Sequence, residues 1–243
     1  MSIKILVSII AYNEEDSIVG TIKDVQNLSS DIDIIVIDDC SLDDTYKKAK
    51  KMGIPVLRHS SNLNTLGFTS VQTSFMYAYK NGYDIYCQFD GDGQHNAMYL
   101  KDIIDPIVNK EADMVIGSRF LNTAGYKSSV IRRVGIYLLS YVVFVFIGKR
   151  IFDITSGFKS YNRKIIEIFA TKYPLTIVDT SEIIVVSHYS GCTINEVPVI
   201  MNSRSHGKSS IGSYKSILFP IRAISYIVGV FLQRGQFFKY NKK

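Results

Sequence analysis

The chain has 243 residues, of which 47% are hydrophobic and 21% are charged. Because domains typically contain about 150 residues, this length allows one large domain or one domain with an appendage. With only 5 prolines and 16 glycines, collagen-like and low-complexity chains are excluded. The 3 cysteines, Cys40, Cys87 and Cys192, form no CxxC pair, which argues against a disulfide framework and a structural zinc site. We therefore expect a globular protein from a reducing compartment.

The formal net charge of +6 is unevenly distributed along the chain. All 22 acidic residues lie at or before Glu196, whereas residues 197–243 contain eight basic residues and no acid. A basic segment rich in aromatic residues suits either a nucleic acid or an anionic membrane surface. Because residues 217–232 are mostly aliphatic and aromatic, we expect this segment to face a membrane surface and no nucleic acid.

The first half of the chain alternates short apolar runs with amphipathic segments, a pattern typical of a parallel sheet covered by helices. We predict strands at Ile3–Ile10, Ile34–Ile37, Pro55–Arg58, Ile85–Phe89 and Met114–Gly117. We predict helices between them at Glu14–Leu28, Leu42–Lys51, Gly67–Lys80 and Met98–Val108. Ser41, followed three residues later by Asp44, resembles a capping box at the start of the second helix. The predicted fold class is therefore α/β.

Two uncharged apolar segments lie in the second half of the chain, Val134–Gly148 with 15 residues and Ala223–Gln233 with 11. Both are shorter than the about 20 apolar residues that a transmembrane helix needs. We expect the first segment to form either a buried core helix or an interfacial helix in the headgroup layer. The basic pairs at 132–133 and 149–150 favour the interface, since bases at both ends suit anionic headgroups.

Polar runs follow three of the predicted strands, at Tyr12–Glu15, Asp38–Ser41 and Asp90–His95. Ligands of open α/β sheets bind at the carboxyl ends of the strands, so these runs are the first place to look for chemistry. In the third run, one glycine separates Asp90 from Asp92 directly after a buried apolar run. Two such carboxylates are costly to bury without a cation. Since Mg²⁺ and Mn²⁺ prefer oxygen ligands, a divalent ion held with the help of Gln94 resolves this cost.

The run Asp90-Gly91-Asp92-Gly93-Gln94-His95 resembles the acidic metal motif of family 2 glycosyltransferases of the GT-A fold. The similarity is to the branch that contains dolichol-phosphate mannose synthase and related polyprenyl-phosphate glycosyltransferases. Six further segments resemble that family in the same order: Ala11–Glu15, Asp38–Ser41, Gly117–Phe120, Thr155–Lys159, Asn195–Pro198 and Arg204–Ser209. The resemblance implies a Rossmann-like, mostly parallel sheet with helices on both faces. We place this GT-A domain at residues 1–212, followed by a basic, membrane-associating helical tail of interfacial helices at 213–243.

The resemblance also implies roles on the donor side. In such enzymes Tyr12, Glu14 and Asp39 would hold the base and ribose of a nucleotide sugar. Asp90 would sit near the ribose and the metal, and Asp92 with Gln94 would hold Mg²⁺ or Mn²⁺. Of the family's glycine-rich stretch after the third strand, only Gly67 is retained.

Two further residues near the metal motif need an interpretation. Arg119 follows the fifth predicted strand and is expected to contact a phosphate of the donor in a bidentate manner. The alternative is a surface arginine paired with Asp113. His95 is expected to shape the metal loop rather than to take part in catalysis.

The acceptor decides which further side chains are needed. An ionised phosphate acceptor requires bases to hold it, and the candidate set is Arg132 or Arg133, Arg204, Lys208 and Ser209. Residues 204–209 resemble the family's loop that closes over the acceptor phosphate; the alternative is a solvated basic loop. A hydroxyl acceptor requires a general base instead, and Glu182 is the candidate for that role.

The sequence therefore predicts an enzyme, a metal-dependent inverting glycosyltransferase. It would move a sugar from a UDP- or GDP-sugar to a polyprenyl phosphate at the cytoplasmic face of the membrane, as a peripheral protein. Inversion follows from the resemblance and from the absence of an identifiable enzymic nucleophile. The enzymic alternative is transfer to a hydroxyl of a lipid-linked saccharide or polysaccharide precursor. A non-catalytic nucleotide-sugar-binding subunit, acting with a membrane subunit or a second copy, is the remaining alternative; it is expected to lose Asp92, Gln94 or Arg119, which are all present.

Overall fold

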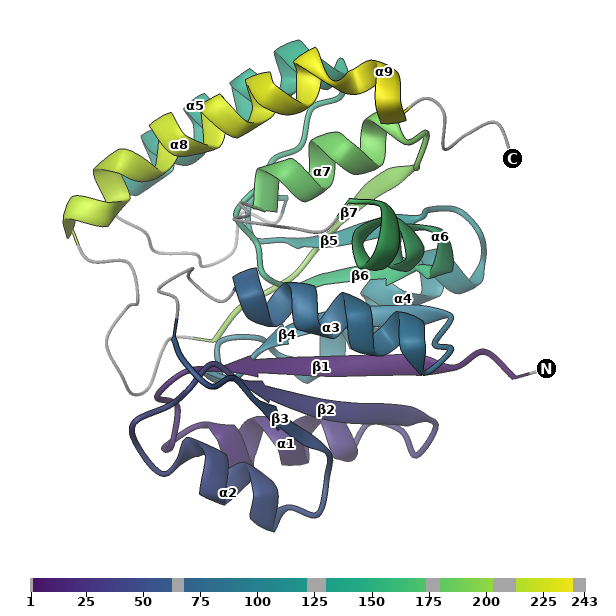
Figure 1. Ribbon diagram of the computed structural model, residues 1–243, viewed down its shortest axis with the longest axis vertical. Helices are drawn as coiled ribbons and strands as arrows, with labels where there is room; N and C mark the ends of the chain where they lie inside the picture. The colour runs from purple at the N-terminus through teal and green to yellow at the C-terminus, as the bar shows by residue number, and fades with distance from the viewer. Residues whose placement is uncertain (1, 63–67, 122–129, 174–179, 203–212, 238–243) are drawn as a thin grey trace.

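The computed structural model describes residues 2–62, 68–121, 130–173, 180–202 and 213–237. Within these ranges it contains a seven-stranded sheet with the strand order β3-β2-β1-β4-β6-β5-β7, covered by helices on both faces (Figure 1). The strands are β1 (Ile5–Ala11), β2 (Ile32–Asp38), β3 (Val56–Arg58), β4 (Ile85–Asp90), β5 (Met114–Ser118), β6 (Lys159–Asn162) and β7 (Ile194–Pro198). Only β6 runs antiparallel to its neighbours in the described sheet. The predicted α/β class with a mostly parallel sheet is confirmed.

Within the same ranges the helices are α1 (Ile18–Gln26), α2 (Thr45–Lys51), α3 (Phe68–Lys80), η1 (Ala97–Tyr99), α4 (Leu100–Val108), α5 (Val130–Ile147), α6 (Arg163–Glu167), η2 (Ile168–Lys172), α7 (Thr180–Tyr189), α8 (Ser213–Leu232) and α9 (Arg234–Phe237). All five predicted strands and all four predicted helices are present, with ends that differ by up to four residues. Strands β6 and β7 were not predicted from the sequence.

The predicted capping box at the start of the second helix is wrong. Helix α2 begins at Thr45, and Asp44, the residue before it, makes no side-chain capping bond. The hydroxyl oxygen of Ser41 instead accepts a hydrogen bond from the backbone N–H of Asn13 at 3.0 Å. Ser41 is therefore used to tie the loop after β2 to the loop after β1, which is a long-range contact that local spacing does not reveal.

Strands β1, β2, β4 and β5 are mostly apolar because both faces of the sheet are covered. Successive side chains alternate between two buried clusters, as the two-residue period of a strand requires. Leu6 belongs to the cluster beneath α3, α5, α7 and α8, whereas Val7 belongs to the cluster beneath α1 and α4. The two cores fix the strand positions, and thereby fix where the loops at the strand ends meet.

Helices α5, α7 and α8 form a layer on one side of the sheet, in which α8 packs against α5 and α7 (Figure 1). Ala223, Ile227 and Val230 of α8 are buried in this layer. The described part of the predicted tail thus packs on the domain rather than standing apart from it. Among the described residues, no helix combines the length and the hydropathy that crossing a bilayer requires.

Candidate active site

The three polar runs after β1, β2 and β4 meet at one edge of the sheet, because these strands are parallel neighbours. Backbone hydrogen bonds tie the runs together: the N–H of Asp39 donates to the carbonyl of Ala11 at 2.9 Å, and that of Gly91 to Ile10 at 2.8 Å. The Ser17 hydroxyl donates to the carbonyl of Gly91 at 2.8 Å. The structure therefore brings the predicted donor-side and metal-side residues of these runs to a single rim.

The loop after β4 carries the predicted metal ligands Asp90, Asp92 and Gln94. The Asp90 side chain is 40% exposed, and Asp92 and Gln94 are half-buried. The backbone N–H of Gln94 donates to Oδ1 of Asp92 at 3.0 Å, and Gly93 between them has a φ of +74°, which glycine adopts without strain. The turn holds the two carboxylates at the rim.

Gly157 packs directly against Asp90. A Cβ atom on Gly157 would lie 2.6 Å from Oδ2 of Asp90, a distance that no real side chain tolerates. The segment around Gly157 can approach the carboxylate this closely only because glycine has no side chain. Gly157 is therefore part of the wall against which the Asp90 carboxylate rests.

The side-chain oxygens of the loop after β4 fit a hard divalent cation. Two carboxylates and one amide supply only oxygen ligands, which Mg²⁺ and Mn²⁺ prefer. Within the described ranges, no three or more His, Cys, Asp or Glu side chains gather in a way that could hold a metal ion. Asp90, Asp92 and Gln94 would therefore hold such an ion only together with further oxygen ligands, which a bound molecule could supply.

His95 is buried beneath the loop after β4 and supports it. Its Nδ1 accepts a hydrogen bond from the backbone N–H of Asp90 at 3.0 Å, so the neutral ring carries its hydrogen on Nε2. The ring stacks on Phe158 with 5.0 Å between centroids and meets the edge of Phe89 at 5.1 Å. Burial lowers the pKa of His95 to about 4. These contacts fit the expected role of a neutral residue that shapes the metal loop.

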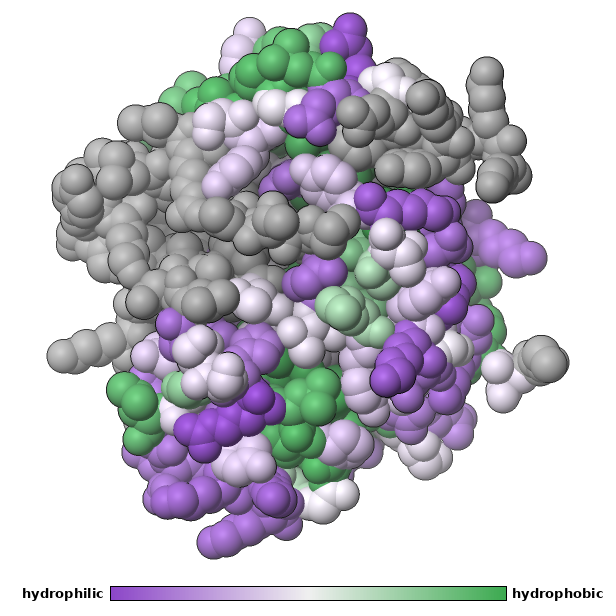
Figure 2. Space-filling model, viewed as in Figure 1, coloured by the Kyte–Doolittle hydropathy of each residue, from purple (hydrophilic) through white to green (hydrophobic). Residues whose placement is uncertain are grey.

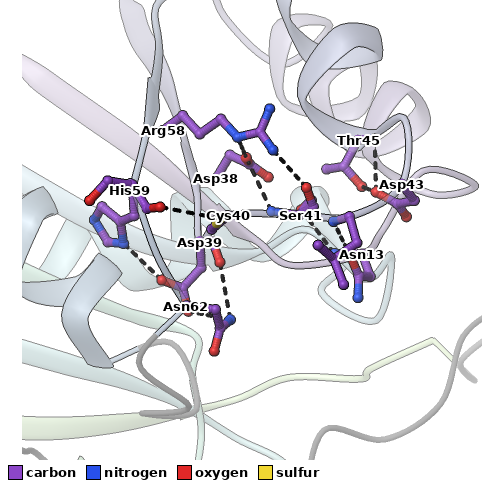
Figure 3. A network of polar contacts seen from close by, with 12 residues as sticks. Asn13, Asp38, Asp39, Cys40, Ser41, Asp43, Thr45, Arg58, His59 and Asn62 are labelled. Atoms are coloured by element: carbon purple, nitrogen blue, oxygen red, sulfur yellow. Dashed lines mark hydrogen bonds and ion pairs between the residues drawn. The ribbon is translucent and has the colours of Figure 1, made fainter.

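On the donor side, the loops after β1 and β2 form a continuous network (Figure 3). The backbone N–H of Glu14 donates to the hydroxyl oxygen of Thr45 at 2.8 Å, and Oδ1 of Asn13 accepts from the N–H of Leu42 at 2.8 Å. Asn13 has a φ of 54°, in the left-handed region that asparagine tolerates better than most residues. Tyr12 and Glu14 remain half-buried at the rim.

Asp39, the third predicted nucleotide contact, is almost completely buried at 2% exposure. Nδ1 of His59 lies 2.7 Å from its Oδ1, and the side-chain amide of Asn62 donates to its Oδ2 at 3.1 Å (Figure 3). Burial raises the pKa of Asp39, and the hydrogen bond with His59 acts in the opposite direction. Asp39 is therefore held from two sides, by residues that the sequence analysis did not single out.

Arg119 is buried and is held by Asp153. Its Nε and Nη2 donate to the two carboxylate oxygens of Asp153 at 2.6 and 2.7 Å, and Nη2 also donates to the hydroxyl of Thr155 at 2.8 Å. The alternative prediction, a surface arginine paired with Asp113, is wrong, because the Asp113 carboxylate accepts hydrogen bonds from Asn162 and Thr193 instead. Arg119 makes its bidentate contact within the protein.

A further carboxylate holds Asp153 in place. Oε2 of Glu196 accepts the N–H of Phe152 at 2.8 Å, and Oε1 accepts the N–H of Asp153 at 2.9 Å. Burial raises the pKa of Glu196, whereas these two backbone bonds lower it. Because Glu196 lies on β7, this arrangement anchors the Asp153–Arg119 pair to the edge of the sheet.

The acceptor side is only partly covered by the structure. Arg204, Lys208 and Ser209 lie outside the described residues, and so do the side chain of Arg132 and, on the donor side, Gly67. Arg133 is exposed on α5.

Glu182, the candidate general base, is buried on α7 and accepts a hydrogen bond from the hydroxyl of Tyr173. Burial and this bond raise the pKa of Tyr173, so the hydroxyl stays protonated as the donor. In the structure this carboxylate is thus buried and engaged by a tyrosine, and its role as a general base stays a prediction.

Three residues at the rim, His59, Asn62 and Asp153, were not predicted from the sequence as site residues. His59 and Asn62 follow β3, so applying the strand-end rule to the third strand as well would have found them. Asp153 lies two residues before the segment Thr155–Lys159, where an acid could have been proposed as the partner of Arg119.

Comparison with known proteins gives a family match over most of the sheet. Residues 6–169 match the model of glycosyl transferase family 2. The UDP-N-acetylglucosamine–dolichyl-phosphate N-acetylglucosaminyltransferase of Methanococcus voltae is 30% identical over 208 residues, which are 78% of this chain and 82% of that protein. The polyprenol monophosphomannose synthase of Mycolicibacterium smegmatis is 26% identical over 218 residues, 85% of this chain and 80% of that protein.

Solved structures share the fold. Glucosyl-3-phosphoglycerate synthase from Mycobacterium tuberculosis, in complex with Mn²⁺, UDP-glucose and phosphoglyceric acid, aligns with a TM-score of 0.65 at 18% identity. The alignment covers 92% of this chain and 79% of that one. The same synthase has also been crystallised with Mg²⁺ and UDP. The predicted GT-A fold is thereby confirmed.

Proposed function

We propose that this chain, which belongs to glycosyl transferase family 2, transfers a sugar from a nucleotide diphosphate sugar to a polyprenyl phosphate. The observation that carries the proposal is the rim itself, where Asp90 and Asp92 project beside the loops after β1 and β2. Of the relatives named above, one is an N-acetylglucosaminyltransferase for dolichyl phosphate and the other is a synthase of polyprenol monophosphomannose. Inversion at the sugar carbon is part of the proposal, and it follows from the family resemblance of the motifs.

In this proposal Asp90, Asp92 and Gln94 hold Mg²⁺ or Mn²⁺. A bound divalent ion supplies charge that neutralises the pyrophosphate and stabilises the nucleoside diphosphate as it leaves. Gly157 supports the site, because its missing side chain leaves room for the Asp90 carboxylate. His95 holds the backbone of Asp90 and stays neutral, so it adds no competing charge.

The donor binds across the loops after β1 and β2, with Tyr12, Glu14 and Asp39 on the side of the base and ribose. Strand β5 is parallel to β4, because β6 pairs antiparallel with both. Arg119, which follows β5, therefore lies at the same edge of the sheet as Asp90. Because Asp153 holds its guanidinium, Arg119 keeps a fixed position at this edge, and a group held in place needs little reorganisation during the reaction.

A phosphate acceptor is preferred over a hydroxyl acceptor. A phosphate is ionised at neutral pH and needs cationic groups to hold it, whereas a hydroxyl needs a general base. Glu182, the candidate base, is buried against Tyr173. The proposed acceptor groups are Arg132, Arg133, Arg204, Lys208 and Ser209.

The proposal includes a peripheral position on the cytoplasmic face of the membrane. Five apolar side chains on one side of α5 are more than half exposed and recur at helical spacing; we call them the α5 apolar face: Val134, Tyr137, Leu138, Tyr141 and Val145. Figure 2 shows hydrophobic surface at the top of the molecule, where α5 and α8 lie in Figure 1. A helix with such a face suits the boundary between headgroups and acyl chains.

Charge at the ends of α5 supports the same position. Arg133 is exposed near its start, and Lys149 and Arg150 are exposed just after its end. Each base near an anionic bilayer surface contributes about 1 kcal/mol of attraction. Because part of α8 is buried, the α5 apolar face is expected to contribute more to membrane contact than the described part of the tail.

The experiment is a transfer assay with radiolabelled UDP- and GDP-sugars and a polyprenyl phosphate in detergent micelles. The wild-type chain should form a glycosyl phospholipid with at least one sugar, and a chelator should abolish the product. No product with any UDP- or GDP-sugar would contradict the transferase proposal. Near-normal transfer in chelator would contradict the metal assignment.

A further inference from the structure

His59 connects the end of β2 to helix α3. Its ring is 17% exposed, and Nδ1 lies 2.7 Å from Oδ1 of Asp39. On the other side, Nε2 lies 2.9 Å from the hydroxyl oxygen of Thr73. Figure 3 shows the ring beside Asp39 with Asn62 on the opposite side of the carboxylate. Both ring nitrogens are therefore engaged, and the orientation of the ring is fixed.

The directions of these hydrogen bonds follow from Thr73. Its hydroxyl donates to the backbone carbonyl of Thr69 at 3.0 Å, and a hydroxyl has only one hydrogen to donate. The oxygen of Thr73 must therefore accept from Nε2–H of His59. One proton is then shared between Nδ1 and Oδ1 of Asp39. Thr73 is not placed as a nucleophile, because its hydrogen is committed to the helix backbone.

The second oxygen of Asp39 is held by Asn62. The amide of Asn62 donates to this oxygen, Oδ2, at 3.1 Å and also to the backbone carbonyl of Asp39 at 3.0 Å. Because Asp39 is only 2% exposed, the most direct way for an incoming hydrogen-bond donor to reach Oδ2 is to take the place of this amide. An N–H group of a base or a ribose hydroxyl has the chemistry to do so.

We propose that His59 is a positioning residue for nucleotide binding. It holds Asp39 through Oδ1, so that Oδ2 accepts a hydrogen bond from the base or ribose in the place that the Asn62 amide fills. The inference rests on the proposed function, which makes Asp39 a nucleotide contact. A carboxylate held in its binding orientation loses less rotational freedom when the ligand binds, so it binds more tightly than a mobile one.

The matched variants are His59→Ala, which removes the contact, and His59→Asn, whose amide can donate to Asp39 from a similar position. Thr73→Val removes the acceptor at Nε2 and leaves Asp39 untouched. His188→Ala, on α7 and outside the rim, is the control for loss of a histidine. Melting temperatures of all four variants report any general loss of folding.

The readouts are the dissociation constants of UDP and GDP by calorimetry, and the KM values of donor and acceptor. We expect His59→Ala to weaken binding of the preferred nucleotide and to raise the donor KM about tenfold, with the acceptor KM unchanged. His59→Asn should restore affinity to within about threefold of the wild type. Thr73→Val should show a smaller loss than His59→Ala, and His188→Ala should show none.

Two outcomes would overturn the inference alone. The first is nucleotide affinity in His59→Ala equal to that of a wild type that binds UDP or GDP. The second is that His59→Ala and His59→Asn lower the melting temperature equally and raise the KM of donor and acceptor equally, which would mean a merely structural role. If His59→Ala fails to fold, the other two variants decide. The inference is then overturned when Thr73→Val binds the nucleotide as tightly as the wild type and a stable His59→Asn binds it tenfold more weakly. A wild type that binds neither nucleotide would contradict the proposed function itself.

Discussion

The polar rim after β1, β2 and β4 and the α5 apolar face differ in how their side chains are held. At the rim, Asp39, Asn13 and Ser41 are fixed by hydrogen bonds that join loops far apart in sequence. On α5, Tyr141 is 65% exposed and Leu138 is 52% exposed. Rigid polar groups suit recognition of a charged nucleotide, whereas exposed apolar side chains suit a partner that is itself apolar. Under the proposed function the rim would carry the chemistry and the α5 apolar face the membrane attachment, and each can be tested without the other.

The largest effect is expected at the metal loop. Asp92→Ala should lower transfer by about a thousandfold, because a charge-stabilising ligand at the leaving group is lost. The melting temperature should change little, since Asp92 is half-buried in a turn at the rim. Asp102→Ala, an exposed acid in the first turn of α4, is the control. Transfer rates within a factor of three for Asp92→Ala and the control would break the assignment of the rim as the chemical region.

The next effect is expected at the pair of Arg119 and Asp153, and it concerns stability as well as transfer. Asp153→Asn leaves a buried guanidinium without its charge partner, which typically costs about 3–5 kcal/mol of folding free energy. Chemical denaturation measures this cost, with Lys47→Met as the control because the Lys47–Asp44 ion pair is exposed. An unchanged midpoint for Asp153→Asn would show that the rim does not depend on this pair.

A smaller effect is expected at Gly157, where a steric change should act on transfer through Asp90. Gly157→Ala places a methyl group 2.6 Å from Oδ2 of Asp90, so the carboxylate must move, and we expect transfer to fall about tenfold to a hundredfold. Gly20→Ala is the matched control, since nothing lies within 4 Å of the added atom. Wild-type kinetics in Gly157→Ala would mean that the position of Asp90 is not important for the reaction.

The smallest effect is expected on α5, and it should touch attachment alone. The double variant Leu138→Ser/Tyr141→Ser should reduce binding to anionic liposomes by at least about tenfold, because each buried apolar side chain contributes about 1.5–3 kcal/mol. UDP and GDP affinity should stay at the wild-type level. Flotation with and without high salt separates apolar from electrostatic attachment.

The matched control for this variant is Leu42→Ser/Met98→Ser, which removes two exposed apolar side chains elsewhere on the surface. Equal loss of liposome binding in both double variants would contradict the prediction that the α5 apolar face attaches the protein to the membrane. Loss of self-association in light scattering, without loss of liposome binding, would instead identify this face as a contact between two copies of the chain.

The location of the rim could be predicted from the sequence because it depends on a simple rule. Buried apolar runs mark the strands, and in a parallel sheet the residues that follow them meet at one edge. Tyr12, Asp39 and Asp90 were found in this way, and the strands that carry them were confirmed. The fold class follows from the same alternation of apolar runs and amphipathic segments.

The parts that could not be predicted depend on contacts between distant segments. Strand β6 contains Lys159 and Ser160, which are fully buried, so its polar sequence hides a central strand from any hydrophobic pattern. The pairing of Arg119 with Asp153, 34 residues apart, was not predictable either. Nor was the hydrogen bond from the N–H of Asn13 to the hydroxyl oxygen of Ser41. Local spacing predicts caps and neighbours along one helix, but it carries no information on these tertiary partners.

The central claim is that the acceptor group is a lipid phosphate, and a comparison of acceptors tests it most directly. The wild-type chain is incubated with its preferred nucleotide sugar and, in parallel, with a polyprenyl phosphate, the corresponding polyprenol, and a polyprenyl-linked saccharide of the same lipid length. The account predicts a glycosylated product from the polyprenyl phosphate only, since an ionised phosphate needs no general base. Transfer to the saccharide at a rate equal to or above that to the phosphate would contradict it.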